Sequence, residues 1–161
     1  MTLDKFDFHV DKESETELVA KAIADSVTEG LVIGLTGTLG AGKTRLVQMI
    51  GRAWQIPDRE IVSPTFTLCT IHQGTHEFHH VDAYRIEDDD QWMELEFDEV
   101  IDDGKIVFIE WVEKFDHFMP DDWLRIELEI LGEETRMIGM TASGPKSRKV
   151  LEGVRKRLSS N

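Results

Sequence analysis

The sequence has little that would suit a membrane protein or a protein of an oxidising compartment. It contains one cysteine, Cys69, among 161 residues, so no intramolecular disulfide can form. No apolar run is long enough to cross a bilayer, and residues 1–5 lack the charged and apolar blocks of a signal peptide. We therefore expect a cytoplasmic protein, away from membranes, in which Cys69 is a buried structural thiol.

Basic residues are also few. The chain has 18 Lys and Arg against 32 Asp and Glu, a formal net charge of −14, and its basic clusters lie only at 146–149 and 155–157. Because nucleic-acid binders normally carry a basic face, tight direct binding of RNA or DNA is disfavoured, and a basic protein partner is more plausible. Residues 87–103 hold ten carboxylates and no Lys or Arg, which predicts either a solvated helix and loop or a docking surface.

What the sequence does contain is a phosphate-binding pattern, G-x-x-x-x-G-K-T, at residues 37–44. Residues 31–36 predict a buried strand entering this loop, and residues 44–50 predict a helix leaving it. Glycines let a backbone bend around an anion, and the helix N-terminus adds partial positive charge. Lys43 can reach the outer phosphates, and the Thr44 hydroxyl can bind Mg²⁺. The predicted nucleotide-binding loop comprises Gly37, Thr38, Leu39, Gly40, Ala41, Gly42, Lys43 and Thr44.

The other segments predict a three-layer α/β fold of the P-loop NTPase type, because helices and strands are mixed around the phosphate loop. We expect a single domain over residues 1–161, with a core at about 6–144. The expected elements are an edge strand at 6–10, a helix at 14–29 capped by Ser14, a hairpin of 66–71 with 77–81, an acidic helical stretch, a central strand at 106–109, a hairpin of 123–131 with 136–141, and a terminal helix at about 146–158. The two antiparallel hairpins make the central sheet mixed.

Two carboxylates follow strand-like runs, as hydrolysis would require. A phosphate loop needs a carboxylate on the metal side and a group that places the attacking water. Glu110 directly follows the run 106–109, and Asp82 follows the shorter run 78–81. Either could hold Mg²⁺ through water while the other orients the nucleophile, so the sequence leaves these two roles open. Together with Lys43, they are the candidate catalytic residues.

The segment Ser63-Pro64-Thr65 fits a switch element that senses the γ-phosphate. Pro64 fixes the backbone, and the hydroxyls of Ser63 and Thr65 flank it for contacts with phosphate, metal or water; an ordinary turn is the alternative. Four histidines, at 72, 76, 79 and 80, straddle the first predicted hairpin. No Cys or His pair has zinc-finger spacing, so a structural metal there is disfavoured.

Four segments, in this order, resemble the TsaE (YjeE) family of small bacterial ATPases of tRNA threonylcarbamoyladenosine biosynthesis. They are the phosphate loop at 39–44, the switch-like 62–68, the H-x-D-x-Y-R pattern at 80–85 and the Glu-Trp pair within 109–111. The resemblance covers about 14–144. Thr38 and His72 depart from it, since the family usually has Asp and often has Tyr at these positions.

The resemblance implies roles for particular residues and for other proteins. It implies that Thr44 and Glu110 hold Mg²⁺, that Asp82 serves ATP hydrolysis, and that Trp111 lies near the nucleotide. Thr16, by the same resemblance, lies near the base or ribose. The implied partners are TsaD and TsaB, whose heterodimer the chain would bind and whose complex its ATP hydrolysis would reset.

Two other functions use the same loop. A small P-loop kinase needs a cluster of arginines in a lid, and here the arginines are scattered. A nucleotide-binding module that does not hydrolyse ATP would act as a clamp between partners. A phosphoryl-acceptor screen separates the first from an ATPase, and phosphate release in the presence of partners separates the second.

Overall fold

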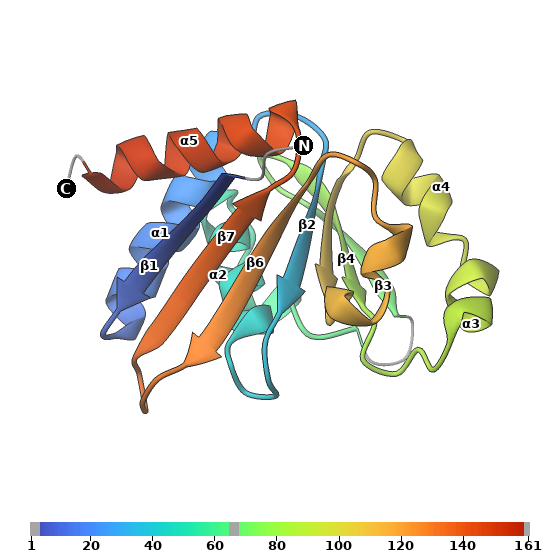
Figure 1. The fold of residues 1–161 in the computed structure, drawn as a ribbon, viewed down its shortest axis with the longest axis horizontal. Coiled ribbons are helices and arrows are strands. Elements are labelled where there is room, and N and C mark those ends of the chain that lie inside the picture. Colours follow the sequence, from blue (N-terminus) through green and yellow to red (C-terminus); the bar gives the residue numbers. More distant parts are fainter. Residues whose placement is uncertain (1–3, 65–67, 160–161) are drawn as a thin grey trace.

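One seven-stranded mixed sheet runs through the molecule, with its strands in the order β1-β7-β6-β2-β5-β4-β3 (Figure 1). The structure is a computed structural model that describes residues 4–64 and 68–159. The strands are β1 (Asp4–Val10), β2 (Leu31–Thr36), β3 (Cys69–Gln73), β4 (Glu77–Asp82), β5 (Ile106–Glu110), β6 (Trp123–Ile130) and β7 (Arg136–Ala142). Strand β2 is parallel to both β5 and β6, and β4 is parallel to β5. The hairpins β3–β4 and β6–β7 are antiparallel, as is the pair β1–β7, so the predicted mixed sheet is confirmed.

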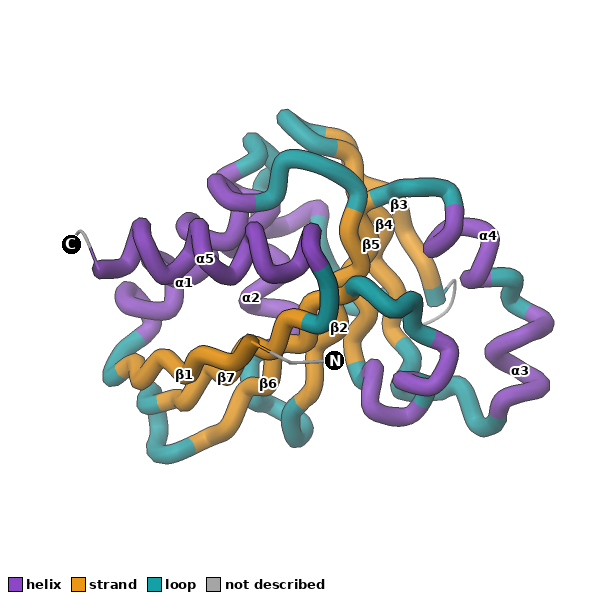
Figure 2. The backbone as a smooth tube through the Cα atoms, turned by 45° about the horizontal axis from the view of Figure 1, so that its top comes forward, coloured by secondary structure: helices purple, strands orange, loops and turns teal. Residues whose placement is uncertain are grey.

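Helices cover the two faces of the sheet unequally. Helices α1 (Glu13–Ser26), α2 (Lys43–Ala53) and α5 (Pro145–Ser159) lie together on one face (Figure 2). The short helices α3 (Asp89–Glu94) and α4 (Phe97–Asp102), with the 3-10 turns Val112–Lys114 and Asp116–Phe118, lie beside β4 and β5 on the other side. The result is the three-layer arrangement expected from the sequence.

The core is divided between these two faces. The larger cluster joins α1, α2 and α5 to the sheet, and the smaller one joins Trp92, Phe97 and Phe115 to the far face of β4 and β5. Every residue of β2 and of β5 is buried, which confirms the prediction of a central strand at 106–109. Each fully buried Ile, Leu or Phe contributes roughly 1.5–3 kcal/mol to folding. The burial of β2 and β5 therefore fixes the positions of the phosphate loop, which follows β2, and of Glu110, which ends β5.

The predicted limits of α1 were wrong. The helix begins at Glu13, with Lys12 as N-cap and no side-chain cap, so Ser14 lies inside its first turn. The Asp11 N–H donates to the Glu15 carboxylate at 3.4 Å, and Glu13 and Glu15 place negative charge at the positive end of the helix dipole. The helix ends at Ser26 rather than 29, because buried Val27 turns into the core in an extended conformation.

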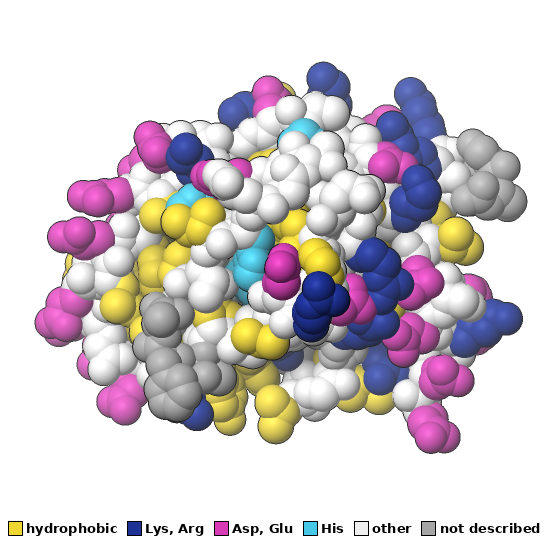
Figure 3. Space-filling model, turned by 180° about the vertical axis from the view of Figure 1, so that it is seen from behind, with side chains coloured by type: hydrophobic (Ala, Val, Ile, Leu, Met, Phe, Trp, Pro, Cys, Tyr) yellow, Lys and Arg dark blue, Asp and Glu magenta, His cyan; other side chains and the backbone are white. Residues whose placement is uncertain are grey.

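Cys69 and the acidic stretch at 87–103 both lie at least partly at the surface. Cys69 is partly exposed rather than buried, although its burial is enough to raise the pKa of the thiol. The acidic stretch forms α3 and α4, whose carboxylates line one edge of the molecule (Figure 3). All ten carboxylates of residues 87–103 are exposed, as solvated helices require. Among the described residues, no helix combines the length and apolar character needed to span a bilayer.

Candidate nucleotide-binding site

The phosphate loop connects the carboxyl end of β2 to the first turn of α2. All three of its glycines have positive φ: 147° at Gly37, 83° at Gly40 and 109° at Gly42. A Cβ on Gly37 would lie 2.6 Å from the carbonyl oxygen of Leu128 on β6, so a side chain cannot fit there. Among the described residues no side chain caps α2, so the N–H groups of its first turn have no side-chain acceptor there. This is the arrangement that suits an anion.

Lys43 begins α2 and is folded back onto the loop. Its Nζ donates to the carbonyl oxygens of Gly37 at 2.6 Å and Thr38 at 3.0 Å, and it lies 3.8 Å from the ring centroid of Trp111. Burial lowers the pKa of Lys43, against the opposing attraction of Glu110 and of two other nearby carboxylates. The ammonium group is thus held by carbonyls and an aromatic ring, all of which a phosphate group can replace as partners.

Thr44 and Glu110 meet directly, although 66 residues separate them in the sequence. The Thr44 hydroxyl oxygen lies 2.8 Å from each carboxylate oxygen of Glu110. The cause is the parallel register, because Glu110 is the last residue of β5 and pairs with Leu35 of β2, next to the loop. Glu110 is only 3% exposed, so this carboxylate needs its polar neighbours.

Asp82 lies beside Glu110 but has different partners. The two residues are paired in the β4–β5 register, at the carboxyl ends of neighbouring parallel strands. One carboxylate oxygen of Asp82 accepts a short hydrogen bond from the Ser63 hydroxyl, and the other accepts from the Tyr84 N–H at 3.0 Å. Asp82 therefore connects the end of β4 to the switch-like segment, whereas Glu110 connects β5 to α2.

A cavity of about 430 Å³ brings most of the predicted residues together. Its walls come from the loop, the Ser63-Pro64 segment, and the ends of β4 and β5. The predicted residues on its wall are Leu39, Gly40, Gly42, Lys43, Thr44, Ser63, Asp82, Glu110 and Trp111. Gly37 and Thr38 instead face a second cavity of about 450 Å³, which Trp111 also lines. Thr65 lies outside the described residues.

Thr16 lies on the other side of the loop. It lines a smaller cavity of about 110 Å³ together with Ala41, Gly42 and Arg45. Gly42 and Arg45 border both this cavity and the main one. The phosphate loop therefore separates Thr16 from Glu110 and Asp82. The cavity that Thr16 lines nevertheless borders Gly42, which also lines the main cavity.

Three residues that contact the site were not among the predicted site residues. Arg136 of β7 donates from Nε to the Ala41 carbonyl at 3.1 Å, so it ties the β6–β7 hairpin to the loop. The Nε2 atom of His80 on β4 lies 2.5 Å from a carboxylate oxygen of Glu110. Arg45, directly after Thr44, is the third. Arg45 has a local signal, its position beside the motif, and His80 begins the H-x-D-x-Y-R pattern, whereas Arg136 has no such signal.

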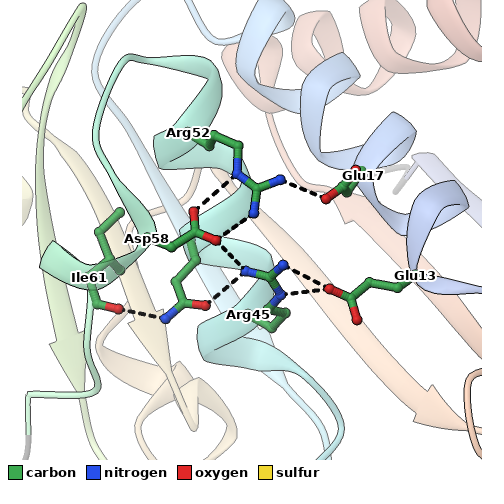
Figure 4. Close-up of polar contacts among 7 residues, drawn as sticks. Glu13, Glu17, Arg45, Arg52, Asp58 and Ile61 are labelled. Carbon is green, nitrogen blue, oxygen red and sulfur yellow. Dashed lines mark hydrogen bonds and ion pairs between the residues drawn. The ribbon is translucent and has the colours of Figure 1, made fainter.

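Arg45 and Arg52 on α2 form a network of ion pairs with three carboxylates (Figure 4). Arg45 pairs with Glu13 at 2.8 Å and with Asp58 at 2.7 Å, while Arg52 pairs with Glu17 at 2.7 Å and also with Asp58. Hydrogen bonds from Arg52 and then Arg45 lower the pKa of Asp58 to about 2. The network connects α1, α2 and the 3-10 turn Asp58–Glu60.

A second contact continues this connection toward the switch-like segment. Gln48 of α2 accepts from Arg45 at 3.2 Å and donates to the Ile61 carbonyl at 2.7 Å (Figure 4). Ile61 is fully buried and precedes Ser63 by two residues. The backbone leading into the switch-like segment is therefore fixed to α2, the helix that begins at the phosphate loop.

The histidines do not gather around a common point. Within residues 4–64 and 68–159, no group of three or more His, Cys, Asp or Glu side chains is arranged to hold a metal ion. His79 and His80 follow one another on β4 and so point to opposite faces of the sheet.

Comparison with known proteins decides the family. The sequence profile described as threonylcarbamoyl adenosine biosynthesis protein TsaE matches residues 10–138. The chain belongs to the TsaE family. The matched range includes the phosphate loop, the switch-like segment and both candidate carboxylates, so the site described above lies inside the region that defines TsaE proteins.

Relatives from distant bacteria carry the name tRNA threonylcarbamoyladenosine biosynthesis protein TsaE. One from Rickettsia felis is 30% identical over 139 residues, covering 86% of this chain and 81% of the relative. One from Bacillus subtilis is 33% identical over 131 residues and covers 81% of each chain. One from Nostoc is 35% identical over 147 residues, covering 88% of this chain and 89% of the relative.

A solved structure shares the fold of this TsaE protein. The crystal structure of Bacillus subtilis YdiB superposes with a TM-score of 0.78 over 97% of both chains, at 24% sequence identity. Together with the family match, this likeness confirms the α/β fold of the P-loop NTPase type that the sequence predicted.

Proposed function

We propose that this chain is an Mg²⁺-dependent ATPase subunit required for tRNA threonylcarbamoyladenosine modification in the cytoplasm. The observation that carries the proposal is the contact between Thr44 and Glu110 at the carboxyl end of β5, beside a glycine loop and the uncapped start of α2. Hydroxyl and carboxylate oxygens are ligands that Mg²⁺ prefers, and this cation usually takes only one or two protein groups beside phosphates and waters. The donor set therefore fits Mg²⁺ with ATP.

The roles of the loop residues follow from their chemistry. Loop N–H groups and the start of α2 bind the phosphates, and Lys43 exchanges its two carbonyl partners for phosphate oxygens. Thr44 and Glu110 would hold Mg²⁺, which would supply neutralisation of the charge on the phosphate oxygens. Trp111 closes the wall beside Lys43. Thr16, on the far side of the loop, faces the base or ribose.

The hydrogen bonds of the two carboxylates support a division of their roles. Glu110 contacts Thr44, so it is assigned to the cation. Asp82 contacts the switch residue Ser63 and is held from its other side by the Tyr84 N–H, so it is assigned to orienting the attacking water. In this scheme Ser63, with Thr65, reports the presence of the γ-phosphate to the switch segment.

The partners we propose are TsaD and TsaB, with ATP hydrolysis resetting their complex between rounds of modification. The relatives' names place them in the biosynthesis of threonylcarbamoyladenosine. The exposed acidic edge formed by α3 and α4 supports a docking role toward a basic protein surface. A net charge of −14 makes tRNA itself a poor direct ligand.

The test compares nucleotide binding with phosphate release in four proteins: wild type, Asp82→Ala, Glu110→Ala and Lys21→Ala, each with and without TsaD–TsaB. Lys21 is an exposed α1 residue paired with Asp25, so its variant is the control for replacing an exposed charged residue outside the site. We expect Asp82→Ala and Glu110→Ala to bind ATP but to release phosphate at least about 100-fold more slowly. Absence of phosphate release from the wild type with partners would favour the non-hydrolysing module.

A further inference from the structure

Glu110 needs a second contact to keep its orientation. A Glu side chain has three rotatable bonds, and the Thr44 hydroxyl, with a single hydrogen, lies 2.8 Å from both carboxylate oxygens. That one hydrogen cannot by itself hold both oxygens in place. Lys43 is electrostatically coupled to Glu110 and offers it a competing attraction.

His80 supplies this second contact. Its side chain is 0% exposed, and its Nε2 atom lies 2.5 Å from Oε2 of Glu110. In the β4–β5 register His80 pairs with Phe108, and Glu110 lies two residues further along β5, so both side chains point to the face covered by α2. The sheet therefore brings the two groups together before any ligand is present.

The tautomer of His80 follows from this geometry. A ring nitrogen facing a carboxylate oxygen must donate, because two acceptors would repel, so the hydrogen lies on Nε2. The Nδ1 atom is buried and has no hydrogen-bond partner among the described residues. An apolar side chain would fill this part of the core without leaving a polar atom unpaired. Compared with an apolar side chain at this position, a histidine adds the contact with Glu110.

We propose that His80 is a positioning residue, whose Nε2–H holds the Glu110 carboxylate facing Thr44. The proposal rests on the proposed function, because it gives Glu110 the role of holding the cation. With Oε2 held by His80, the remaining lone pairs of the carboxylate stay directed toward Thr44. Without this donor, Glu110 is free to turn toward Lys43, and the cation site loses its preorganised ligand.

The chain offers a matched control in the adjacent residue. His79 is also buried, at 8% exposure, and its Nδ1 atom likewise has no partner among the described residues. It points to the opposite face of β4, and its nearest carboxylate, Glu77, is 4.0 Å away and lies at the start of the strand. Substitutions at 79 and 80 thus remove buried imidazoles from the same strand, but only one of them contacts Glu110.

The experiment uses a pair of amides that differ in reach. In His80→Gln the side-chain N–H₂ lies as far from the backbone as Nε2, whereas in His80→Asn it falls short by one bond. His79→Gln and His79→Asn are the controls. Binding of a non-hydrolysable ATP analogue is titrated with Mg²⁺ and, separately, measured in EDTA. Nitrogen-15 NMR of the nucleotide-free wild type reports the ring tautomer.

We expect His80→Asn to raise the Mg²⁺ concentration needed for half-maximal binding by about 10–100-fold, with affinity in EDTA changed less than about twofold. His80→Gln restores the wild-type requirement, both His79 variants keep it, and the NMR spectrum shows the Nε2–H tautomer at His80. The positioning role is rejected if His80→Asn matches wild type, if Gln is no better than Asn, if the His79 variants share the defect, or if the hydrogen lies on Nδ1. If wild-type binding does not respond to Mg²⁺ at all, the proposed function fails and the positioning role fails with it.

Discussion

At the scale of single residues, Lys43 already has polar and aromatic partners in the positions that the proposed function gives to phosphate oxygens. Its ammonium group is desolvated and is satisfied by the carbonyls of Gly37 and Thr38 and by the ring of Trp111. These partners carry only partial charge, so exchange for phosphate oxygens is favourable and needs movement of one side chain. The loop backbone can stay in place during that exchange.

We expect Lys43→Ala to weaken ATP binding and to lower phosphate release by at least about 100-fold, because a charge-assisted contact to the phosphates is lost. Calorimetry of ATP binding and a phosphate-release assay measure the two effects. The charge-loss variant Lys21→Ala should behave as wild type. Unchanged affinity and rate in Lys43→Ala would contradict the proposed loop chemistry.

Alanine substitutions at Gly37 and Gly40 would distinguish the cost of backbone strain from the cost of a steric clash. Both have positive φ, but only a Cβ at 37 meets a neighbour, the Leu128 carbonyl oxygen at 2.6 Å; a Cβ at 40 meets nothing within 4 Å. We expect Gly40→Ala to lower the free energy of unfolding by about 1–2 kcal/mol. Gly37→Ala should cost about 1–3 kcal/mol more, because β6 must shift. Urea unfolding of both variants measures this, and equal losses would contradict the clash.

At the scale of elements, α2 serves both ends of the site. Its first turn carries Lys43 and Thr44, and its outer side carries Arg45, Gln48 and Arg52, which hold the backbone before the switch-like segment. The pairs are partly exposed, so each contributes about 0–1 kcal/mol. Their effect is chiefly geometric, because they fix the backbone just before Ser63.

We expect Asp58→Asn to lower the free energy of unfolding by about 1 kcal/mol at pH 7. The pKa of Asp58 is lowered to about 2 from its usual 3.8, so its stabilisation is complete above pH 3.8 and is lost as pH falls toward 2. The difference between wild type and variant should therefore shrink as the pH falls from about 4 to about 2 in urea unfolding. Glu60→Gln is the control, since that carboxylate makes no hydrogen bond or ion pair with a described residue. A difference that stays constant with pH would contradict the ion-pair network.

The sequence predicted those elements whose signal is local. Both hairpins, the buried strand at 106–109 and the terminal helix were predicted from period and turn residues, and each is present. The limits of α1 were wrong because tertiary burial of Val27, and not a glycine, ends the helix. Glu110 and Asp82 were predicted from their places directly after strand-like runs, and each is the last residue of its strand.

The contacts that complete the site have no local signal. His80 reaches Glu110 across 30 residues, and Arg136 reaches Ala41 across 95. Such pairs depend on which strands become neighbours and in what register. Hydrophobic period gives neither the order β6-β2-β5-β4 nor the register within it. The partners of the site residues therefore could not be predicted.

At the scale of the whole molecule, charge separates the surface into regions. Carboxylates line the edge formed by α3 and α4, and basic side chains are concentrated on α5. We expect the long-range repulsion of a polyanion by a net charge of −14 to outweigh the attraction of one basic helix of 15 residues. A protein partner with a basic face is attracted by the same field.

We expect the isolated chain to bind tRNA weakly, with a dissociation constant no tighter than about 1 µM at physiological salt, the range of non-specific contacts. Fluorescence anisotropy with labelled tRNA, at several salt concentrations, measures this. Any residual binding should decrease when Lys156 and Arg157 of α5 are replaced by Gln. A nanomolar complex at physiological salt would show that the acidic balance is not decisive.

The hydrogen bond from Arg136 to the Ala41 carbonyl joins the β6–β7 turn to the nucleotide loop, and the same guanidinium also donates to the Gly132 carbonyl at 2.8 Å. A ligand that displaces the Arg136 side chain from the Gly132 carbonyl would also change the free energy of its contact with the Ala41 carbonyl of the loop. In the proposed function, where the loop binds a triphosphate, thermodynamic reciprocity requires that triphosphate binding change the affinity of the hairpin turn for such a ligand by the same factor. The turn between β6 and β7 is thus coupled to the phosphate loop through Arg136.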